Sequence, residues 1–462
     1  MTCLPKNVFR FLMVLVLVLG ASTLFAKTNV ILMIVDGGGE GAYRIGSQNR
    51  TGEDRGLPFM KHEDGWKEFG CTTYSFSGMV RNSGAEMEGK VTADYSEDGS
   101  YNPDTHWKDF ETHMKNPTDS AASATALNTG FKTNNGRISM DTEGNKLETT
   151  AEFAVKNGFA AGVITNVMPS HATPAAVAAH NMKRGEGKDL WREMVKKDVL
   201  SVVMGACHPW YDRNGERREE ADFDKYGPSE HAWGLITTKD LYFGWKFIEK
   251  REDFQDIASG KVAPPKKLMG LPQVSSTFQS SRSSKKAERN ENVPTLTECC
   301  MAGINVLNQN EKGFYLVVES GSVDWIHNNP KRCCEEMNEY FDAVEAICAW
   351  VEKNSSWEET TLILTADHDT FSIFGPDADK EETLFRTPIG KGKGEIPECE
   401  YFCKGHSNAP VPFFVKGPGA EEIAKRVRCT DETFGKIWGF KGEIIDNTDV
   451  APVAKKLFDA GK

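Results

Sequence analysis

The chain has 462 residues, of which 39% are hydrophobic and 26% are charged, the balance of a globular protein with a large buried core. Its formal net charge of -12 argues against a nucleic-acid groove as the main binding site. The length is compatible with two or three domains, or with one large α/β sheet that carries insertions.

The first 26 residues have the pattern of a secretory signal peptide. Lys6 and Arg10 precede an apolar run at residues 11–19, and small residues follow at 20–22. The apolar run is too short to span a bilayer comfortably. We therefore expect cleavage after Ala26 and export of the mature chain to the periplasm or the extracellular space.

The chain contains 11 cysteines, and ten remain once Cys3 leaves with the signal peptide. An even number in an exported chain favours disulfides. Cys399 and Cys403 are close enough in sequence to pair, whereas the adjacent cysteines at 299–300 and 333–334 cannot be assigned. Buried free thiols are the alternative for the rest, and the spacings match no structural zinc module.

The first predicted strand is the continuous apolar run at residues 30–35, typical of a parallel strand buried on both faces. It ends at Asp36, which three glycines follow. Ligands of open α/β sheets bind beyond the carboxyl ends of the strands, so Asp36 is a candidate metal ligand. For this cluster alone, a turn aspartate is the alternative.

Residues 118–125, Thr-Asp-Ser-Ala-Ala-Ser-Ala-Thr, are too poor in large apolar side chains for an ordinary core segment. They begin a predicted helix that runs to a stop at Gly130. Ser120 at the start of this helix is a candidate nucleophile. For a lone serine at such a position, a helix N-cap is the usual role.

Further strands also lead into polar residues. A strand predicted at 158–165 precedes His171 and Thr173, and the helix after Pro174 is predicted to carry His180 and Arg184. Apolar spacing at 337, 341, 344, 348 and 351 predicts an amphipathic helix between two later strands, at 314–318 and 362–364. The candidate ligands on and after those strands are Glu319, Asp324, His327, Asp367, His368 and, beyond a loop, His406.

Two segments interrupt this alternation. Residues 185 to about 293 have the character of an insertion, and residues 370 to about 405 form a shorter crown-like loop. Within the insertion, residues 275–292 are rich in Ser, Lys, Arg and Asn, which predicts a flexible loop or linker.

The alternation of strands and helices predicts a parallel α/β sheet with helices on both faces. The candidate ligands would then gather along one edge of the sheet. Mixed imidazole and carboxylate sets suit Zn²⁺, and oxygen-rich sets suit Mg²⁺. Such an edge suits phosphoryl transfer, because metals activate a hydroxyl nucleophile while an arginine fork and a helix N-terminus bind phosphate.

Several pieces of the chain, in this order, resemble the alkaline phosphatase family. They are Val-Asp36-Gly, Thr-Asp119-Ser120-Ala-Ala-Ser-Ala-Thr with Thr-Gly-Phe-Lys-Thr-Asn-Asn-Gly, His171-Ala-Thr173-Pro-Ala, Glu319 with Asp324, Thr-Ala-Asp367-His368, and His406-Ser with Gly-Pro-Gly. The resemblance runs from Asn29 to about Gly419. It implies a three-layer α/β/α sandwich with a mostly parallel central sheet, two Zn²⁺ and one Mg²⁺ per chain, and a homodimer.

The resemblance also implies roles for single residues. Ser120 would be the nucleophile that becomes transiently phosphorylated, and Arg184 would bind phosphate while Asp119 orients it. The first zinc site would consist of Asp324, His327 and His406. The second, which would lower the pKa of a bound Ser120, would consist of Asp36, Asp367 and His368. The magnesium site would consist of Asp36, His171, Thr173 and Glu319.

The chain departs from the family pattern at three positions. His171 stands where some members have Asp, and Trp325 follows Asp324 where others have Lys or His. The family usually has a His four residues after the first-zinc Asp, but here His327 is three residues on and Asn328 takes the usual place. We expect His327 to be the ligand, because positions three and four apart share a helix face and an amide oxygen binds zinc weakly.

The implied function is a secreted phosphomonoesterase acting on small phosphate monoesters, with no nucleic-acid partner and no membrane span in the mature chain. One alternative is a phosphodiesterase or sulfatase of the same superfamily. No Cys-x-Pro-x-Arg or Ser-x-Pro-x-Arg sulfatase signature is present, and Arg184 favours a fully charged monoester. The other alternative is an exported metal- or phosphate-binding protein that has lost turnover.

Overall fold

A computed structural model describes residues 27–83, 101–238, 242–284, 286 and 288–461. The predicted signal peptide lies outside these residues. Within the described part of the chain, no helix is both long and apolar enough to cross a membrane.

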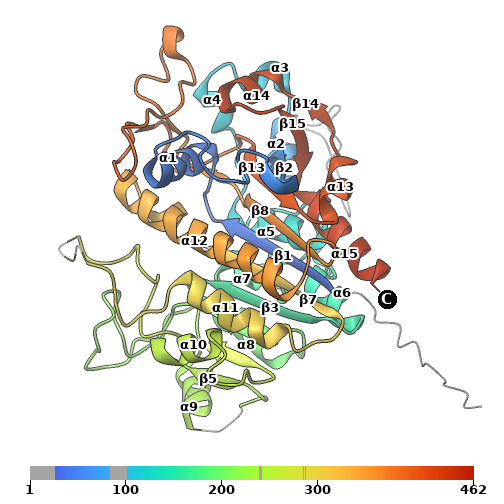
Figure 1. The fold of residues 1–462 in the computed structure, drawn as a ribbon, viewed down its shortest axis with the longest axis vertical. Helices are drawn as coiled ribbons and strands as arrows, with labels where there is room; N and C mark the ends of the chain where they lie inside the picture. The colour runs from blue at the N-terminus through green and yellow to red at the C-terminus, as the bar shows by residue number, and fades with distance from the viewer. Residues whose placement is uncertain (1–26, 84–100, 239–241, 285, 287, 462) are drawn as a thin grey trace, which may run out of the picture.

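An eleven-stranded sheet forms the centre of the molecule, in the order β14-β15-β2-β13-β8-β1-β7-β3-β4-β6-β5 (Figure 1). Neighbours from β8 to β5 run parallel, whereas β13 is antiparallel to both β2 and β8. The mostly parallel sheet expected from the sequence is confirmed. The strands are β1 (Thr28–Val35), β2 (Lys67–Thr72), β3 (Ala160–Thr165), β4 (Val202–Met204), β5 (Lys246–Ile248), β6 (Leu268–Gly270), β7 (Gly313–Ser320), β8 (Thr360–Ala366), β13 (Val411–Lys416), β14 (Cys429–Thr430) and β15 (Glu443–Asp446).

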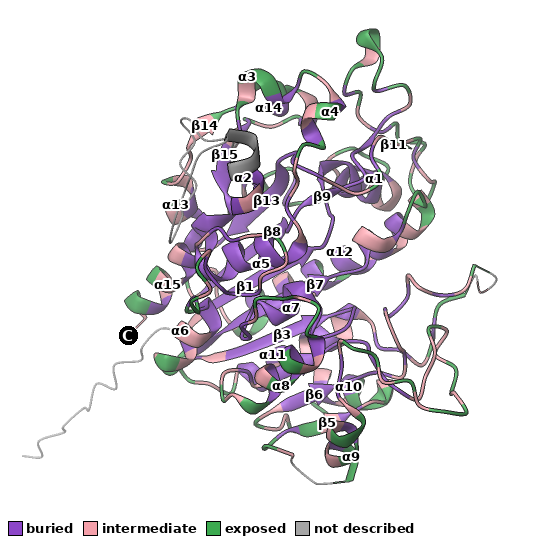
Figure 2. Ribbon diagram, turned by 180° about the vertical axis from the view of Figure 1, so that it is seen from behind, coloured by how far each residue is buried: buried purple, intermediate pink, exposed green. Residues whose placement is uncertain are grey.

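Helices cover both faces of this sheet because successive side chains of a strand point to opposite sides. Ile31, Met33 and Val35 of β1 pack on one side and Val30, Leu32 and Ile34 on the other. The first side is covered by α1 (Glu40–Thr51), α10 (Arg251–Ala258), α11 (Leu296–Leu307) and α12 (Pro330–Asn354). The second is covered by α5 (Ser120–Thr129), α6 (Thr150–Lys156), α7 (Ala172–Ala175), α8 (Gly187–Lys196), α9 (Glu230–Thr238), α13 (Gly419–Ala424) and α15 (Val450–Ala460). Figure 2 shows the resulting buried centre between two layers of helices.

A third apolar cluster lies at the end of the sheet formed by β14 and β15. It contains residues of α2 (Phe76–Ser83), α4 (Phe110–His113) and α14 (Glu432–Trp438), next to the short helix α3 (Pro103–His106). The crown-like loop adds two antiparallel pairs, β9 (Asp369–Thr370) with β12 (His406–Ser407), and β10 (Ile373–Phe374) with β11 (Glu400–Tyr401). The first pair brings His406 opposite Thr370, next to the carboxyl end of β8.

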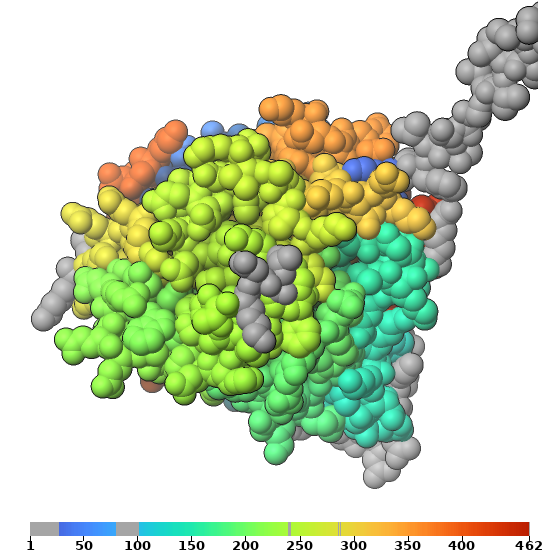
Figure 3. All heavy atoms as spheres, turned by 90° about the horizontal axis from the view of Figure 1, so that it is seen from below, coloured from blue at the N-terminus to red at the C-terminus, as the bar shows by residue number. Residues whose placement is uncertain are grey.

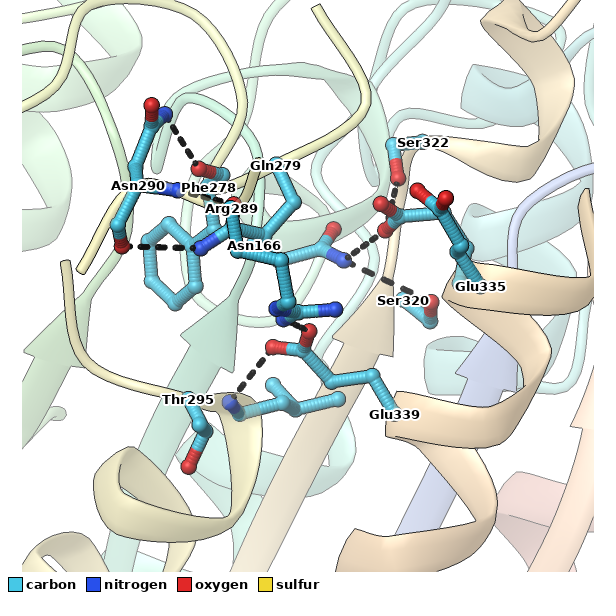
Figure 4. A network of polar contacts seen from close by, with 12 residues as sticks. Asn166, Phe278, Gln279, Arg289, Asn290, Thr295, Ser320, Ser322, Glu335 and Glu339 are labelled. Atoms are coloured by element: carbon cyan, nitrogen blue, oxygen red, sulfur yellow. Dashed lines mark hydrogen bonds and ion pairs between the residues drawn. The ribbon is translucent and has the colours of Figure 1, made fainter. Parts of the chain in front are cut away.

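The segment at 185–293 is built into the sheet, because it supplies the edge strands β4, β6 and β5. Its residues, green to yellow in Figure 3, make up most of the face seen from below. The described residues of 275–292 form a loop, as expected, but specific hydrogen bonds hold this loop against the rest of the molecule, unlike a free linker. Asn290 bonds to the Phe278 carbonyl and the Gln279 side chain, and the Phe278 amide donates to the Asn166 carbonyl (Figure 4).

The expected disulfides are absent from the described structure. Each of its ten cysteines carries a free thiol, including Cys399 and Cys403. Seven are buried, at 71, 207, 299, 300, 333, 334 and 403, so the alternative of buried thiols describes most of the set. Burial raises the pKa of the Cys300 and Cys207 thiols above their usual range, which keeps them protonated.

Candidate active site

Three parallel strands bring the predicted ligands to one edge of the sheet. In the register of β1 with its neighbours, Val35 lies opposite Ser320 of β7 and Ala366 of β8. Asp36 and Asp367, each one residue past its strand, therefore lie side by side. Gly37 then turns the chain with φ +75°, where a Cβ would lie 2.9 Å from the backbone of Asp324, so this approach requires glycine.

Asp36, Asp367 and His368 form the first group with metal-binding geometry. All three are fully buried, and their donor atoms lie within 4.8 Å of one another. His368 Nε2 lies 3.4 Å from Asp36 Oδ1 and 3.2 Å from Asp367 Oδ2. Thus the residues expected at the second zinc site come together.

A second group consists of Asp324, His406 and, again, His368, with donor atoms within the same 4.8 Å. His406 Nε2 lies 3.4 Å from Asp324 Oδ1, and the two imidazole rings stack with centroids 3.6 Å apart. Nδ1 of His406 donates to the Thr118 carbonyl at 2.8 Å, which leaves Nε2 facing the carboxylate. Asp324 and His406 therefore meet as expected, and the third residue within this distance is His368, which also belongs to the first group.

His327 lies outside both groups. The expectation of a shared helix face is wrong, since the 3-10 turn at Val323–Trp325 ends before it and His327 has a left-handed backbone with φ 41°. Its ring is exposed and packs edge-on against Phe371 at 5.6 Å. Asn328 is also exposed and left-handed, with φ 47°, so neither residue enters the cluster.

Ser120 is the first residue of α5, and Asp119 is the N-cap, accepting from the Ala122 amide at 2.9 Å. The capping role considered for Ser120 therefore belongs to its neighbour. Ser120 is 1% exposed, and its hydroxyl lies 3.2 Å from Nε2 of His368, the residue common to both groups. The helix N-terminus adds partial positive charge at this position.

Arg184 reaches the site from the segment after α7. Its Nη1 donates to Asp119 Oδ2 at 3.0 Å, and its Nη2 donates to His171 Nε2 at 3.1 Å. The predicted helix over this segment is wrong, because α7 ends at Ala175. Asn181 and Arg184 instead donate their backbone amides to the carbonyls of Ile138 and Gly136.

Glu319, His171 and Thr173, expected at the third metal site, are all buried next to this cluster. Thr165, opposite Glu319 in the β3–β7 pair, donates its hydroxyl to Glu319 Oε2. The other carboxylate oxygen of Glu319, Nδ1 of His171 and the hydroxyl of Thr173 have no hydrogen-bond partner among the described residues.

Comparison with known proteins shows which family this chain resembles. A model of the family described as alkaline phosphatase matches residues 79–411. Alkaline phosphatase 4 of Bacillus subtilis is 31% identical over 297 residues, which are 62% of this chain and 57% of that enzyme. The human tissue-nonspecific isozyme is 27% identical over 310 residues, 60% of this chain and 57% of that enzyme. The matches thus span little more than half the length of these relatives.

The chain belongs to the alkaline phosphatase family. Solved structures show the same fold. The alkaline phosphatase of the Antarctic bacterium TAB5 aligns over 94% of this chain and 99% of its own, with a TM-score of 0.60 and 20% identity. A cold-active enzyme from Shewanella sp. aligns over 93% and 100%, with a TM-score of 0.61 and 22% identity.

The alkaline phosphatase family is metal-dependent, and the residues present fit cations. Both oxygens of Asp36 and Oδ2 of Asp367 are buried without a hydrogen-bond partner among the described residues. Burial and then the nearby carboxylates raise the pKa of Asp36, while burial raises the pKa of Glu319 to about 8 and that of Asp367 to about 7. Crowded, desolvated carboxylates of this kind need positive charge between them to stay ionised.

Two of the three buried histidines at the site are neutral, whereas the hydrogen bond and the charge of Asp324 outweigh burial and raise the pKa of His406 to about 9. Burial lowers the pKa of His368, and burial with the charge of Arg184 lowers that of His171 to about 3. Thr370 Oγ1, which donates to Asp324 Oδ1 at 2.7 Å, lies 3.2 Å from His368 Nδ1. This arrangement assigns the His368 proton to Nδ1 and leaves Nε2 free for a metal.

The sequence did not point to the residues that hold the Glu319–Asp324 turn. Asn166, directly after β3, accepts from the Gly321 amide at 2.7 Å and donates to Glu336 Oε2 at 3.1 Å. Ser322 donates to the same Glu336 oxygen at 2.6 Å. The position of Asn166 just past a strand was the one available signal, since Glu336 lies on a helix more than 150 residues away.

Proposed function

We propose that this chain is an exported, metal-dependent phosphomonoesterase that hydrolyses phosphate monoesters through a phosphoserine. The observation that supports this most directly is the position of Ser120. Its hydroxyl lies at a helix N-terminus, 3.2 Å from a ring nitrogen of His368, the residue that both candidate metal groups share. A nucleophile needs this combination of positive field and activating neighbours.

The side chains of the site suggest how the two steps, phosphoryl transfer to Ser120 and hydrolysis of the phosphoserine, would proceed. Ser120 Oγ attacks phosphorus in line with the leaving oxygen, so that the Ser120 O–P bond forms as the P–O bond to the alcohol breaks. The serine proton passes to solvent, and the leaving oxygen takes one up from solvent to give the alcohol. Arg184 binds two of the three equatorial oxygens, held in place by Asp119. Water then attacks the phosphoserine from the same side as the departed alcohol, releasing inorganic phosphate and restoring the hydroxyl.

Two Zn²⁺ and one Mg²⁺ fit the donor sets. Asp36, Asp367 and His368 would hold one zinc, and Asp324 and His406 the other, with His327 as the expected third ligand. Asp36, Glu319, Thr173 and His171 would hold magnesium. Bound cations supply Lewis-acid charge that lowers the pKa of hydroxyl groups and offsets charge on leaving oxygens. Homodimer formation and a periplasmic or extracellular location belong to the same proposal.

The test compares p-nitrophenyl phosphate with bis(p-nitrophenyl) phosphate at alkaline pH with Zn²⁺ and Mg²⁺. We expect efficient release of p-nitrophenol from the monoester and little from the diester, because Arg184 and the metals match a fully charged phosphate. Ser120→Ala should remove most turnover while metal content stays near wild type. Ser259→Ala, at an exposed position after α10, serves as the control and should keep full activity.

The two alternatives predict other results. Preference for the diester would indicate a phosphodiesterase. Metal and phosphate binding without turnover of either ester would indicate a binding protein, the alternative that the exposed His327 favours. Undiminished activity of Ser120→Ala would contradict the assignment of the nucleophile.

A further inference from the structure

A cavity of about 300 Å³ lies between the start of α12 and the described part of the 275–292 segment. Trp325 forms part of its wall, together with Arg282, Lys331, Arg332 and Glu335. Trp325 directly follows Asp324, and its ring meets the His171 ring edge-on with centroids 5.2 Å apart. The same side chain therefore packs against the proposed third metal site and lines this cavity.

The cavity lining carries more positive than negative charge. Arg282 Nη2 lies 2.9 Å and Arg332 Nη1 3.0 Å from the same oxygen of Glu335. One carboxylate thus faces two guanidinium groups. Lys331 is exposed and forms no ion pair among the described residues. The cavity lining thus carries three cationic side chains and one anionic side chain, although the net charge of the whole chain is -12.

Arg282 is built into the wall rather than lying on the surface. It is 4% exposed, and its Nη1 donates to the carbonyl and the side chain of Gln279 at 2.8 and 2.9 Å. Its Nε is buried and has no hydrogen-bond partner in the described part of the chain. An unpartnered donor on a buried guanidinium is costly, so Arg282 retains hydrogen-bonding capacity that Gln279 and Glu335 do not use.

The helix that borders the cavity also favours an anion. The 25-residue helix α12 begins here, and Asn329, its N-cap, lines the cavity. No acidic residue lies in its first turn, which carries Lys331 and Arg332 instead. Cations at a helix N-terminus oppose the macrodipole, so an anion bound there would be stabilised by both.

The wall is held in position before any ligand binds. The network in Figure 4 ties the segment to the sheet through Asn166 and to α12 through the Arg289–Glu339 ion pair. Asn290 and Gln279 exchange hydrogen bonds within the segment. Arg282 therefore keeps its orientation toward the cavity at little entropic cost on binding.

We propose that this cavity is a leaving-group subsite that binds a second anionic group of the substrate, such as the distal phosphate of a bisphosphate. The proposal rests on the proposed function, since the first phosphate must lie at Ser120. Trp325 would separate the two phosphates, with the carbon chain of the leaving group passing its ring. The cationic cavity would then lower KM for substrates that carry two phosphates.

The experiment measures kcat/KM for the first phosphate released from matched alkanediol monophosphates and bisphosphates with four, six and eight carbons. We expect the wild-type holoenzyme to prefer the bisphosphate at one or two chain lengths, corrected for its two equivalent ends. Lys331→Ala/Arg332→Ala should reduce this preference roughly 3- to 10-fold, and added salt should reduce it in the wild type only. Lys353→Ala, at the other end of α12, is the matched control and should retain the preference.

Equal bisphosphate preference in the wild type and the double variant, or none in the wild type, would overturn the proposal. If the wild type hydrolyses neither substrate, the proposed function fails, but the subsite is still tested by calorimetry on Ser120→Ala protein. Tighter binding of the bisphosphate, lost with Lys331 and Arg332, would support the subsite. A separate binding event for inorganic phosphate, lost in the double variant without any bisphosphate preference, would mean that the cavity takes a free anion, and would overturn it.

Discussion

Asp119 connects two catalytic tasks through its two carboxylate oxygens. Oδ1 accepts from the Ala122 amide and caps α5, while Oδ2 accepts from Arg184 and from the Gly136 amide at 2.9 Å. The residue that fixes the start of the helix carrying the proposed nucleophile thus also fixes the arginine proposed to bind phosphate. Because one carboxylate sets both positions, the distance between Ser120 and Arg184 depends little on the loops around them.

His327 is the predicted zinc ligand that lies outside both metal groups. A zinc ion requires at least three protein ligands, and once His368 serves the second zinc, Asp324 and His406 leave one position open. We predict that His327→Ala loses about one zinc and nearly all activity, while Asn328→Ala keeps both zinc ions, as measured by metal analysis of purified protein. Retention of both zinc ions in His327→Ala would show that its exposed ring is not a ligand, and loss in Asn328→Ala would place the ligand one residue on.

The elements that repeat a simple period were predictable from the sequence. The apolar run of β1 and the 337–351 spacing of α12 gave a strand and a helix, because burial on fixed faces dictates their patterns. The elements that failed depend on distant partners. The helix after Pro174 ends because Asn181 pairs with Ile138, and the 275–292 segment is ordered by Asn166 and Glu339, contacts that local composition does not contain.

His180 joins two helices and gives a pH prediction. Burial opposes its charge, but hydrogen bonds to Glu152 of α6 and Glu193 of α8 raise its pKa to about 9, and Lys197 lies 3.4 Å from its Nδ1. A raised pKa in the folded state stabilises the protein fully below pH about 6.5, and that stability is lost as the pH rises through about 9. The contribution is on the order of 1–3 kcal/mol.

We therefore expect His180→Gln to be less stable than wild type at pH 6.5 and nearly equal to it at pH 9.5, as measured by urea unfolding across this range. The exposed His231→Gln is the control and should follow the wild-type curve. A constant stability difference between His180→Gln and wild type across the range would mean that His180 contributes through packing and not through its charge.

At the scale of the whole molecule, the C-terminal segment holds α5, the helix that carries the proposed nucleophile. Asn447 donates to Ser123 Oγ at 3.0 Å, and Ser123 in turn donates to the backbone carbonyl of Asp367. Lys132, just past α5, donates to Asp446 and Asn447 at 2.8 Å each. The strand-end ligand, the nucleophile helix and the end of the sheet thus form one connected unit, although Lys132 and Asp446 are 314 residues apart.

The Lys132–Asp446 pair gives the prediction that tests this unit. Both side chains are at most 2% exposed. Burial opposes the charge of Asp446, but the charge of Lys132 and the hydrogen bonds from Lys132 and Thr448 together lower its pKa. Lys132→Met keeps most of the volume but leaves a buried carboxylate without its cation. It should lower the free energy of unfolding by about 3–5 kcal/mol, whereas breaking an exposed pair costs less than about 1 kcal/mol. Lys261→Met, which removes the exposed partner of Asp256, is therefore the control. Urea unfolding at neutral pH measures both variants, and similar small losses in the two would show that the buried pair does not hold the C-terminal segment against α5.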